Sequence, residues 1–419
     1  MSDIAPGSDP ASESDPSSGP ALRPVIRLKP KADARSLRWG APWVYADDLV
    51  TDRRTKALPP GTLAVLQDAE RAELGLVAVN PESRIMARML DRDPGAEIDR
   101  GWFVIRLSRA LELRQRIYEQ PFYRLVHAEA DGLPGVVIDR FGDAAVIQPN
   151  AAWAEARLDD LAAALIEVTG VATVIKNAGG RARGLEGLDD QGAVLAGGVA
   201  APVPVRMNGA TYLADLAGGQ KTGLFYDQRD NQAFAQRLAR GARVLDVFSH
   251  VGGFGLAALA GGAAHVTCVD ASAAALDLAT RGAEAMGQGT ARFATRQGDA
   301  FDVMTALEDE GAQFDLVICD PPAFAPSKQA LEAGLRAYEK TARAGARLVD
   351  AAGGYLALCS CSHAATLEKF RNACLRGIGR AGRQVQLIHT GQAGPDHPLH
   401  PQLAESGYLK ALAFRVLPV

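Results

Sequence analysis

The sequence lacks the segments that would place a protein in a membrane or outside the cell. No apolar run reaches the roughly 18 residues that a membrane-spanning helix requires. The first twenty residues contain no lysine or arginine and no sustained apolar stretch, so they do not resemble a secretion signal. We therefore expect a cytoplasmic protein with no membrane partner.

Cysteine is scarce, with five residues in a chain of 419. The number is odd, and no two cysteines have the CxxC spacing of a zinc site. We therefore expect free thiols in a reducing compartment and no metal. The five are Cys268, Cys319, Cys359, Cys361 and Cys374.

Regular repeats are also missing, because the 43 glycines and 23 prolines are spread along the chain without a period. This excludes a collagen-like or solenoid protein. The formal net charge of −4 argues against a protein that coats nucleic acid, although one local surface can still be basic. With 47% hydrophobic residues, the chain is long enough for more than one core.

Composition divides the N-terminal part of the chain. Residues 1–22 are rich in Ser, Pro and acids, which predicts a disordered tail. Residues 23–98 predict a small β domain, with strands over Thr62–Gln67, Leu74–Val79 and Arg84–Leu90. Between Ala21 and Lys56, nine basic residues outnumber four acids and are interleaved with aromatics, a composition that binds phosphates and stacks bases. The alternative is a small barrel whose aromatics, Trp39, Trp43 and Tyr45, fill its core.

Residues 99–205 predict a central α+β domain. We expect helices over Phe103–Tyr118 and Trp153–Val168, a hairpin of Gly135–Arg140 with Ala144–Gln148, and a strand over Thr173–Lys176. Residues 206–419 alternate strand and helix as a doubly wound, Rossmann-like sheet does. The predicted fold class is therefore α/β, with this C-terminal sheet preceded by the β and α+β domains.

Candidate ligand-binding residues follow the predicted strands of the C-terminal domain. Gly252 and Gly253 lie in a loop after the strand Val244–Phe248, and Asp270 ends the next strand, where it can accept ribose hydroxyls. Alone, this pattern also fits a nicotinamide enzyme or an empty Rossmann-like core, since the loop is not GxGxxG. Asp299 can accept from an adenine amino group. Asp320-Pro321-Pro322 aims a carboxylate and carbonyls into the crevice.

Several motifs resemble those of class I S-adenosylmethionine-dependent methyltransferases: Asp246–Gly255, Phe314–Phe324 and Leu358–His363. Four more narrow the resemblance to the large-subunit ribosomal RNA cytosine-C5 methyltransferase family. They are Thr222–Asn231, Asp131–Arg140, Asp396-His397-Pro398 and Tyr408-Leu409-Lys410. The resemblance covers about residues 24 to 418 and leaves out only the acidic tail.

The resemblance implies an N-terminal PUA domain that binds RNA, a central domain that helps to hold RNA, and S-adenosyl-L-methionine as cofactor. It implies that large-subunit ribosomal RNA is the partner, and a homodimer is compatible with it. The cofactor contacts that it implies are Ser249, Gly252, Gly253, Asp270, Asp299 and Asp320. A strap over cofactor or target is implied for Thr222, Phe225, Asp227 and Arg229, and a helix-capping role stays open for Asp227 or Asp230.

The chemistry of the implied reaction independently requires a cysteine. Cytosine C5 becomes nucleophilic enough for methylation only after a thiolate adds to C6. Cys361 is the last residue of a predicted strand, Tyr355–Cys361, and a helix follows it. The dipole at the N-terminus of that helix favours a thiolate. We predict Cys361 as the nucleophile and expect Cys359 to face the other side of the strand. Cys268 and Cys374 are expected to be small buried hydrophobes.

Other residues complete the predicted mechanism. Ala323 occupies the position after Asp-Pro-Pro where some RNA cytosine methyltransferases carry a second cysteine, so one catalytic thiol is expected. Cys319 should point away from the site. Asp320 is the first candidate to accept the C5 proton, His397 is a weaker one, and His363 is placed to assist Cys361.

Two other functions remain open. One keeps the fold but methylates a guanine ring nitrogen without a covalent step, leaving Cys361 structural. The other is a non-catalytic RNA-binding protein that holds the cofactor as a structural ligand. These residues do not indicate which nucleotide is methylated. The target base must leave the base stack, because its C5 edge has to reach both a thiol and a sulfonium.

Overall fold

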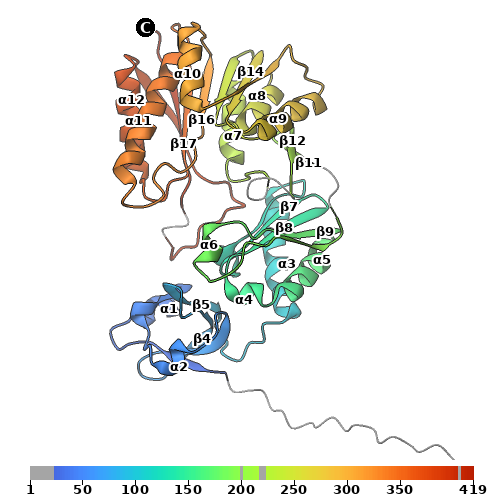
Figure 1. The fold of residues 1–419 in the computed structure, drawn as a ribbon, viewed down its shortest axis with the longest axis vertical. Coiled ribbons are helices and arrows are strands. Elements are labelled where there is room, and N and C mark those ends of the chain that lie inside the picture. The colour runs from blue at the N-terminus through green and yellow to red at the C-terminus, as the bar shows by residue number, and fades with distance from the viewer. Residues whose placement is uncertain (1–22, 199–201, 217–222, 404–406) are drawn as a thin grey trace, which may run out of the picture.

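The computed structural model describes residues 23–198, 202–216, 223–403 and 407–419. The predicted tail and Thr222 lie outside these ranges. Three domains follow one another along the long axis of the molecule, each built on its own sheet (Figure 1). Within the described residues, no helix is both long and apolar enough to cross a membrane.

The N-terminal domain contains a five-stranded sheet in the order β1-β3-β4-β5-β2. Its helices are short because each begins at an aspartate cap and soon meets a turn: Asp33 accepts from the amide of Ser36, and Asp52 from that of Thr55. The elements are β1 (Val25–Arg27), α1 (Ala34–Arg38), β2 (Trp43–Tyr45), α2 (Arg53–Lys56), β3 (Thr62–Gln67), β4 (Glu73–Val79) and β5 (Ile85–Asp91).

The core of this domain is aliphatic, formed by residues such as Ile26, Leu66 and Val77. The alternative in which aromatics fill a barrel core is therefore wrong. Trp39 is 63% exposed, and Trp43 is half-buried with its indole N–H donating to Glu129 of the central domain at 2.8 Å. Trp39 thus faces solvent, and Trp43 contacts the neighbouring domain.

The central domain contains a sheet in the order β10-β9-β8-β7-β6, covered by α3 and α5. Asp99 caps α3 by accepting from the amide of Trp102, and the 18-residue helix buries one face. The elements are α3 (Arg100–Ile117), β6 (Phe122–His127), β7 (Val136–Phe141), β8 (Ala144–Pro149), α4 (Ala152–Glu155), α5 (Leu158–Thr169), β9 (Thr173–Lys176), α6 (Arg181–Gly184) and β10 (Ala193–Ala196).

The helix predicted over Trp153–Val168 is in fact two helices, α4 and α5. Trp153 is fully buried, and its indole N–H donates to the carbonyl of Pro134 at 2.9 Å. The backbone of Arg157 leaves the helical region, and α5 then begins with Asp159 and Asp160 in its first turn, where the helix dipole favours them. Periodicity alone does not detect such a one-turn break.

A hairpin of β11 (Val203–Met207) and β12 (Ala210–Ala214) joins the central and C-terminal domains. Its turn is Asn208-Gly209, with φ of 52° and 72°, as a two-residue hairpin of type I′ requires. The predicted domain boundary between residues 205 and 206 would cut β11. The boundary between the two domains therefore lies before Val203. The Asn-Gly pair was the sequence signal for this hairpin.

The C-terminal sheet has the order β15-β14-β13-β16-β17-β19-β18. Its first five strands are parallel, and β19 is antiparallel to both neighbours, which confirms the predicted Rossmann-like α/β sheet. Its strands are β13 (Arg243–Val247), β14 (His265–Asp270), β15 (Phe293–Gln297), β16 (Leu316–Cys319), β17 (Gly354–Ser360), β18 (Val385–Gly391) and β19 (Lys410–Val416). Its helices are α7 (Arg229–Leu238), α8 (Gly253–Ala260), α9 (Ala273–Ala285), α10 (Ala300–Asp309), α11 (Leu331–Leu348) and α12 (Leu367–Arg380).

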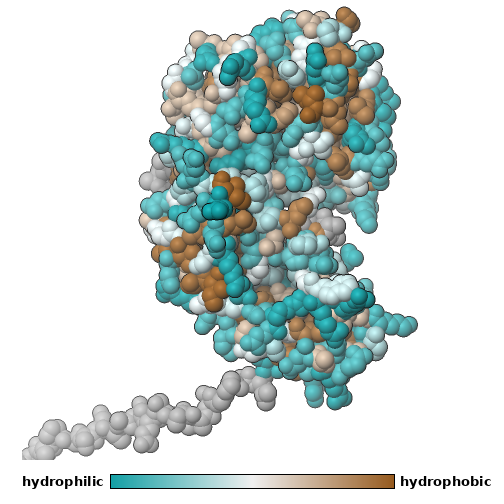
Figure 2. Space-filling view, turned by 180° about the vertical axis from the view of Figure 1, so that it is seen from behind, coloured by the Kyte–Doolittle hydropathy of each residue, from teal (hydrophilic) through white to brown (hydrophobic). Residues whose placement is uncertain are grey.

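The domains share their cores at both junctions. Leu76 and Leu90 of the N-terminal sheet pack in the cluster of the central domain, and Phe141 and Val146 of the central sheet pack against the C-terminal domain. Figure 2 shows that apolar side chains gather on the rear of the central domain, whereas the N-terminal domain is largely hydrophilic there. The apolar junctions fix how the three domains are arranged.

Candidate functional site

The candidate site lies at the carboxyl edge of the C-terminal sheet. β14 and β15 lie on one side of β13, and β16 lies on its other side. The strand order therefore reverses between β13 and β16. Open α/β sheets bind ligands in the crevice at such a switch point. Ser249, Asp270, Asp299 and Asp320 all follow or end strands at this edge.

The loop after β13 is held in an unusual backbone conformation. Phe248 and His250 have φ of 64° and 51°, and Gly252 has φ of 81°. Residues other than glycine rarely adopt this left-handed region, and such strain concentrates at functional sites. Gly252 and Gly253 then begin α8, with both amides donating to the carbonyl of Ser249.

Asp246 connects this loop to the strand beneath it. Its side chain is fully buried, and Oδ2 accepts from the amide of Gly255 at 2.7 Å. Within the described residues Oδ1 has no hydrogen-bond partner. Burial raises the pKa of Asp246 to about 7, with the charge of Asp270 acting in the same direction. A Cβ on Gly255 would lie 2.5 Å from Cys268 Sγ, so glycine is needed here for close packing of helix on strand.

Asp270 and Asp299 both orient backbone amides. Asp270 is half-buried and accepts from the amides of His250 and Ser272 at 2.8 and 2.9 Å, so it ties the glycine loop to the end of β14. Asp299 is exposed and caps α10 through Oδ1, which accepts from Phe301 and Asp302. Both carboxylates thus have fixed orientations at the edge of the crevice.

Asp320 follows β16 directly, and its Oδ1 accepts from the side-chain amide of Gln228 at 2.9 Å. Pro321 is buried and Pro322 exposed, so the chain turns outward there. Cys319, one residue earlier, is fully buried in the core on one face of the sheet, as predicted.

Three half-buried phenylalanines, which no sequence motif predicted, stand near these carboxylates. Phe248, Phe301 and Phe324 follow β13, β15 and β16, and their ring centroids lie 6.2 to 6.5 Å apart. Lys340 Nζ lies 4.0 Å from the centroid of Phe301. The rings form an apolar wall of the size and shape that suits a flat heterocycle.

Cys361 differs from the other four cysteines in its exposure. Cys268, Cys319, Cys359 and Cys374 are buried, and burial raises the pKa of each thiol. Cys361 is partly exposed and stands one residue beyond β17. Cys319 pairs with Leu358, so Cys361 lies two residues further along the sheet edge than Asp320, which follows the neighbouring β16.

The predicted reason for preferring Cys361 over Cys359 is wrong. Residues two apart on a strand share a face, so alternation does not separate them. The separation comes from the end of β17 at Ser360: Cys359 is 2% exposed and lies inside the core cluster, whereas Cys361 lies beyond the strand at its edge.

The segment that carries Cys361 is held by hydroxyl groups. Tyr338 of α11 is buried, and its hydroxyl lies 2.8 Å from Ser360 Oγ and 2.7 Å from Ser362 Oγ. Ser362 Oγ also accepts from the amide of Ala325 at 2.9 Å. These bonds fix the backbone on both sides of the thiol and tie it to the segment after Asp320.

Lys410 at the start of β19 is a second residue for which no role was predicted. It pairs with Ser360 across the sheet, is 7% exposed, and donates from Nζ to the carbonyl of Ser362 at 2.6 Å. Burial lowers its pKa from 10.5 to about 8, while the nearby Cys361 charge acts to raise it. Lys410 forms no ion pair with a carboxylate in the described part of the chain. The motif Tyr408-Leu409-Lys410 was the signal for it.

The predicted strap residues lie at the boundary between the domains. Tyr408 donates to Asp227 Oδ2 at 2.6 Å, so Asp227 is not a helix cap; α7 begins after Gln228, which has no side-chain capping bond. The ring of Phe225 lies 5.3 Å from that of His250 in the glycine loop. Arg229 is buried, with its guanidinium 4.2 Å from the ring centroid of Tyr118.

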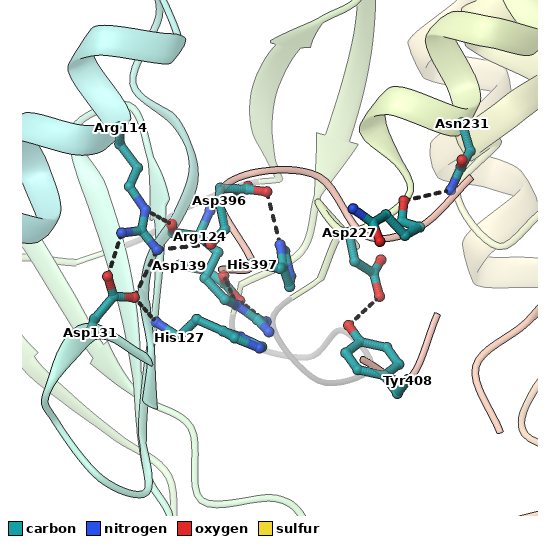
Figure 3. A network of polar contacts seen from close by, with 11 residues as sticks. Arg114, Arg124, His127, Asp131, Asp139, Asp227, Asn231, Asp396, His397 and Tyr408 are labelled. Carbon is teal, nitrogen blue, oxygen red and sulfur yellow. Dashed lines mark hydrogen bonds and ion pairs between the residues drawn. The ribbon is translucent and has the colours of Figure 1, made fainter. Parts of the chain in front are cut away.

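Figure 3 shows the polar network in which His397 lies. Its Nδ1 is 2.8 Å from Asp396 Oδ1, and its ring lies 5.0 Å from that of His127 in the central domain. Arg114 donates two hydrogen bonds, of 2.6 and 2.8 Å, to the carboxylate of Asp131 and a third to the carbonyl of Asp396. His397 thus serves in a buried domain junction. His363 is exposed, and its ring lies 5.5 Å from that of Tyr408.

No group of three or more His, Cys, Asp or Glu side chains in the described ranges is arranged to hold a metal ion. The donors at this edge are backbone amides, isolated carboxylates and aromatic rings. Their chemistry fits a ligand with a ribose, a flat base and charged ends.

The comparisons with known proteins concern nearly the whole chain. Residues 188–415 match the model of a family described as S-adenosylmethionine-dependent methyltransferase, and residues 26–92 match that of a PUA-like domain. A ribosomal RNA large subunit methyltransferase of Deinococcus radiodurans is 36% identical, over 94% of this chain and 98% of its own. Ribosomal RNA large subunit methyltransferase I of Erwinia tasmaniensis is 35% identical, over 92% and 98%.

Solved structures agree in fold. A SAM-dependent methyltransferase from Streptococcus mutans has a TM-score of 0.78 and 21% identity, covering 94% of this chain and 100% of that chain. A methyltransferase structure complexed with SAH matches with the same TM-score, identity and coverage. At this level of identity the likeness concerns the fold alone.

Proposed function

The chain belongs to the S-adenosylmethionine-dependent ribosomal RNA large subunit methyltransferases, and from this premise we propose that it forms 5-methylcytosine in large-subunit ribosomal RNA through a covalent adduct of Cys361. The predicted PUA-like domain, the methyltransferase fold and the cofactor S-adenosylmethionine are confirmed. The choice of base and the covalent step are our proposal.

One observation carries the proposal. Of the five cysteines, all within the described residues, Cys361 is the one that is not buried, and it stands at the ligand-binding edge one strand away from Asp320. A thiol with a purely packing role has no reason to stand there. A buried ammonium, that of Lys410, lies beside the same segment and favours the thiolate form.

The proposed reaction uses these groups in sequence. Bound S-adenosylmethionine supplies an electrophilic methyl group. The Cys361 thiolate adds to C6 of cytosine and forms a C–S bond, which makes C5 nucleophilic, so that C5 takes the methyl group. A base then removes the C5 proton, the C6–S bond breaks, and the thiolate and the double bond are restored.

Asp320 is our candidate for that base. Its carboxylate stands at the end of the strand next to that of Cys361, and the amide of Gln228 occupies one oxygen and orients the other. His397 is less suitable, because its ring is buried in the junction with Asp396 and His127.

The cofactor fits the crevice through residues with distinct roles. The left-handed loop at Ser249 and Gly252 leaves room for a close approach to backbone, and Asp270 offers carboxylate oxygens at the end of β14. Asp299, with one oxygen committed to the helix cap, faces solvent at the end of β15. We assign the wall of Phe248, Phe301 and Phe324 to the adenine ring.

The experiment that tests the proposal follows methyl transfer to large-subunit ribosomal RNA. We expect the wild-type protein to form 5-methylcytidine, detected by nucleoside mass spectrometry, and Cys361→Ala to form none. Cys374→Ala removes a buried thiol on α12 and serves as the control that retains activity. Full activity of Cys361→Ala, or methylguanosine as the product, would reject the proposal.

A second measurement detects the covalent step directly. In RNA that contains 5-fluorocytidine, fluorine replaces the C5 proton and cannot be removed by a base, so the adduct persists. We expect wild-type protein with S-adenosylmethionine to migrate with the RNA on a denaturing gel, and Cys361→Ala to migrate alone. A methyltransferase that attacks a ring nitrogen directly would form no such complex.

A further inference from the structure

A cavity of about 390 Å³ lies between the N-terminal domain and α3, away from the cofactor crevice. Gly40, Pro42 and Arg92 line it from the N-terminal domain, and Arg106 and Arg109 line it from α3. Its volume is in the range of sites that enclose a small ligand, which distinguishes it from a flat surface. It has no role in the methyl-transfer chemistry described above.

The net charge of this cavity is positive. Its two acidic lining residues are already neutralised: Glu129 accepts from Arg88 at 2.9 Å, and Asp131 is held by Arg114. Arg92 and Arg109 are exposed and have no ion pair or hydrogen bond in the part of the chain that the structure describes. Two uncompensated guanidinium groups therefore face the same space.

An exposed aromatic residue precedes the cavity lining in the sequence. Trp39, immediately before Gly40, is 63% exposed, and the guanidinium of Arg35 lies 4.1 Å from the centroid of its ring. A cation over one face of an indole holds the ring in position while other parts of it stay open to a partner. Exposed tryptophan next to guanidinium groups is the combination that binds unpaired bases and their phosphates.

The cavity is formed in advance of any ligand. Arg88 bridges from β5 to Glu129 and Glu186 of the central domain at 2.9 and 3.0 Å, and Asn80 donates to Glu186 at 2.9 Å. These side chains are largely buried, so they fix the two walls relative to each other. A preformed site avoids the entropy cost of ordering its walls when the ligand binds.

The same cavity also reaches the C-terminal domain. His400 lines it from the C-terminal domain, and burial lowers the pKa of this histidine, which keeps its ring neutral. Asp396, four residues before His400, accepts from the amide of Arg124 and lies 2.8 Å from His397 in the domain junction. An RNA segment held in the cavity therefore lies next to the junction between the central and C-terminal domains.

We propose that this cavity binds a single-stranded segment of the RNA substrate, with Arg92 and Arg109 on its phosphates and Trp39 stacked on one of its bases. The proposal rests on the proposed function only for RNA as the partner, and not on the base that is methylated. A duplex does not fit the arrangement, because its bases are stacked and present no free face to Trp39.

The test measures binding separately from methyl transfer. A fluorescein-labelled single-stranded RNA of mixed sequence and a hairpin duplex of equal length are titrated with protein at several salt concentrations, and anisotropy gives the affinity. We compare Arg92→Gln/Arg109→Gln with Arg240→Gln/Arg343→Gln. The second pair is an equal change of charge in the C-terminal domain, at two exposed arginines that do not line the cavity.

We expect the cavity variant to bind the single strand roughly 25-fold more weakly than the wild type at 0.1 M salt. Each lost phosphate contact lowers the slope of log affinity against log salt concentration by about 0.7. The slope itself should fall by about 1.4, and Arg240→Gln/Arg343→Gln should match the wild type. Trp39→Ala should weaken binding about fivefold or more without changing the slope, because stacking releases no counterions.

Three results would overturn the proposal: wild-type affinity in the cavity variant, an equal loss in Arg240→Gln/Arg343→Gln, or tighter binding of the duplex than of the single strand. Both arginines are exposed, and thermal unfolding checks that the variants stay folded. If binding follows the expected pattern while no 5-methylcytidine forms, the proposed function fails and the RNA site stands.

Discussion

Replacing Lys410 by Met should make the protein more stable and less active at the same time. The side chain is 7% exposed, and burial lowers its pKa from 10.5 to about 8. This shift corresponds to roughly 3 kcal/mol by which the folded state disfavours the charged form. Methionine has a similar length and carries no charge, so Lys410→Met removes that cost.

The gain is reduced by one lost contact. Lys410 Nζ donates to the carbonyl of Ser362 at 2.6 Å, and leaving that acceptor without its donor costs about 1 to 2 kcal/mol. We therefore expect the free energy of unfolding at pH 7 to rise by about 1 to 2 kcal/mol in Lys410→Met. Urea unfolding followed by circular dichroism measures it, with the exposed Lys369→Met as the control that stays within about 0.5 kcal/mol of wild type.

The pH dependence has a definite sign. At pH 7 both the folded and the unfolded chain bind the Lys410 proton, so the cost is fully present. Between about pH 8 and 10.5 the unfolded chain binds more protons than the folded chain, so the stability of the wild type rises with pH relative to that of Lys410→Met. Above about pH 10.5 the charge of Lys410 no longer contributes to the difference in stability between the two proteins.

The loss of activity follows from the same charge. Without the ammonium beside it, the Cys361 thiolate is less favoured, and we expect alkylation of Cys361 by iodoacetamide at pH 7 to slow about tenfold or more. Lys410→Arg should retain most of the rate. If Lys410→Met is destabilised by more than about 1 kcal/mol and its Cys361 reacts at the wild-type rate, the electrostatic role of Lys410 is wrong.

Three further outcomes are expected. A thiol reagent should titrate one cysteine, Cys361, in the native protein and five in denaturant, because the other four are buried; rapid reaction of a second thiol would contradict this. Gly255→Ala should lose about 1 to 3 kcal/mol in thermal unfolding and weaken S-adenosylmethionine binding in calorimetry, because its Cβ would stand 2.5 Å from Cys268 Sγ. The control Gly379→Ala, with open space around it on α12, should be neutral or slightly stabilising, and an equal loss in both would refute the packing argument. Asp246 has a folded-state pKa raised to about 7, so stability is lost as pH rises from about 4 through 7; Asp246→Asn should be more stable than wild type at pH 8, by up to about 4 kcal/mol, and not at pH 4. Urea unfolding of the ligand-free proteins at the two pH values measures this difference, and a gap that does not depend on pH would refute the assignment.

Much of the fold was predictable because it follows from local patterns. The strands Thr62–Gln67 and Thr173–Lys176 have the predicted bounds. Their apolar periods are strong and their boundaries carry turn or capping residues. The elements that were missed, such as β6 and β18, are edge strands, and each is stabilised by pairing with a single neighbouring strand, which no local pattern contains.

The candidate site was predictable only in part. Residues that follow strands at the same sheet edge, such as Asp270 and Asp320, were found because parallel strands place their carboxyl ends together. Lys410 was assigned no role, because its place beside Cys361 depends on the antiparallel pairing of β19 with β17. The cavity at Arg92 and Arg109 depends on how two domains pack.

By itself, the sequence determined the order of the domains, the α/β class of the C-terminal sheet and the set of thiols from which a nucleophile could come. The tertiary structure decided which thiol meets the cofactor edge, because burial separates Cys361 from Cys359 where strand alternation does not. It also decided what surrounds that thiol. The reactivity of a sulfur and the affinity of a cavity depend on charges and burial supplied by distant segments, and only the folded chain brings these together.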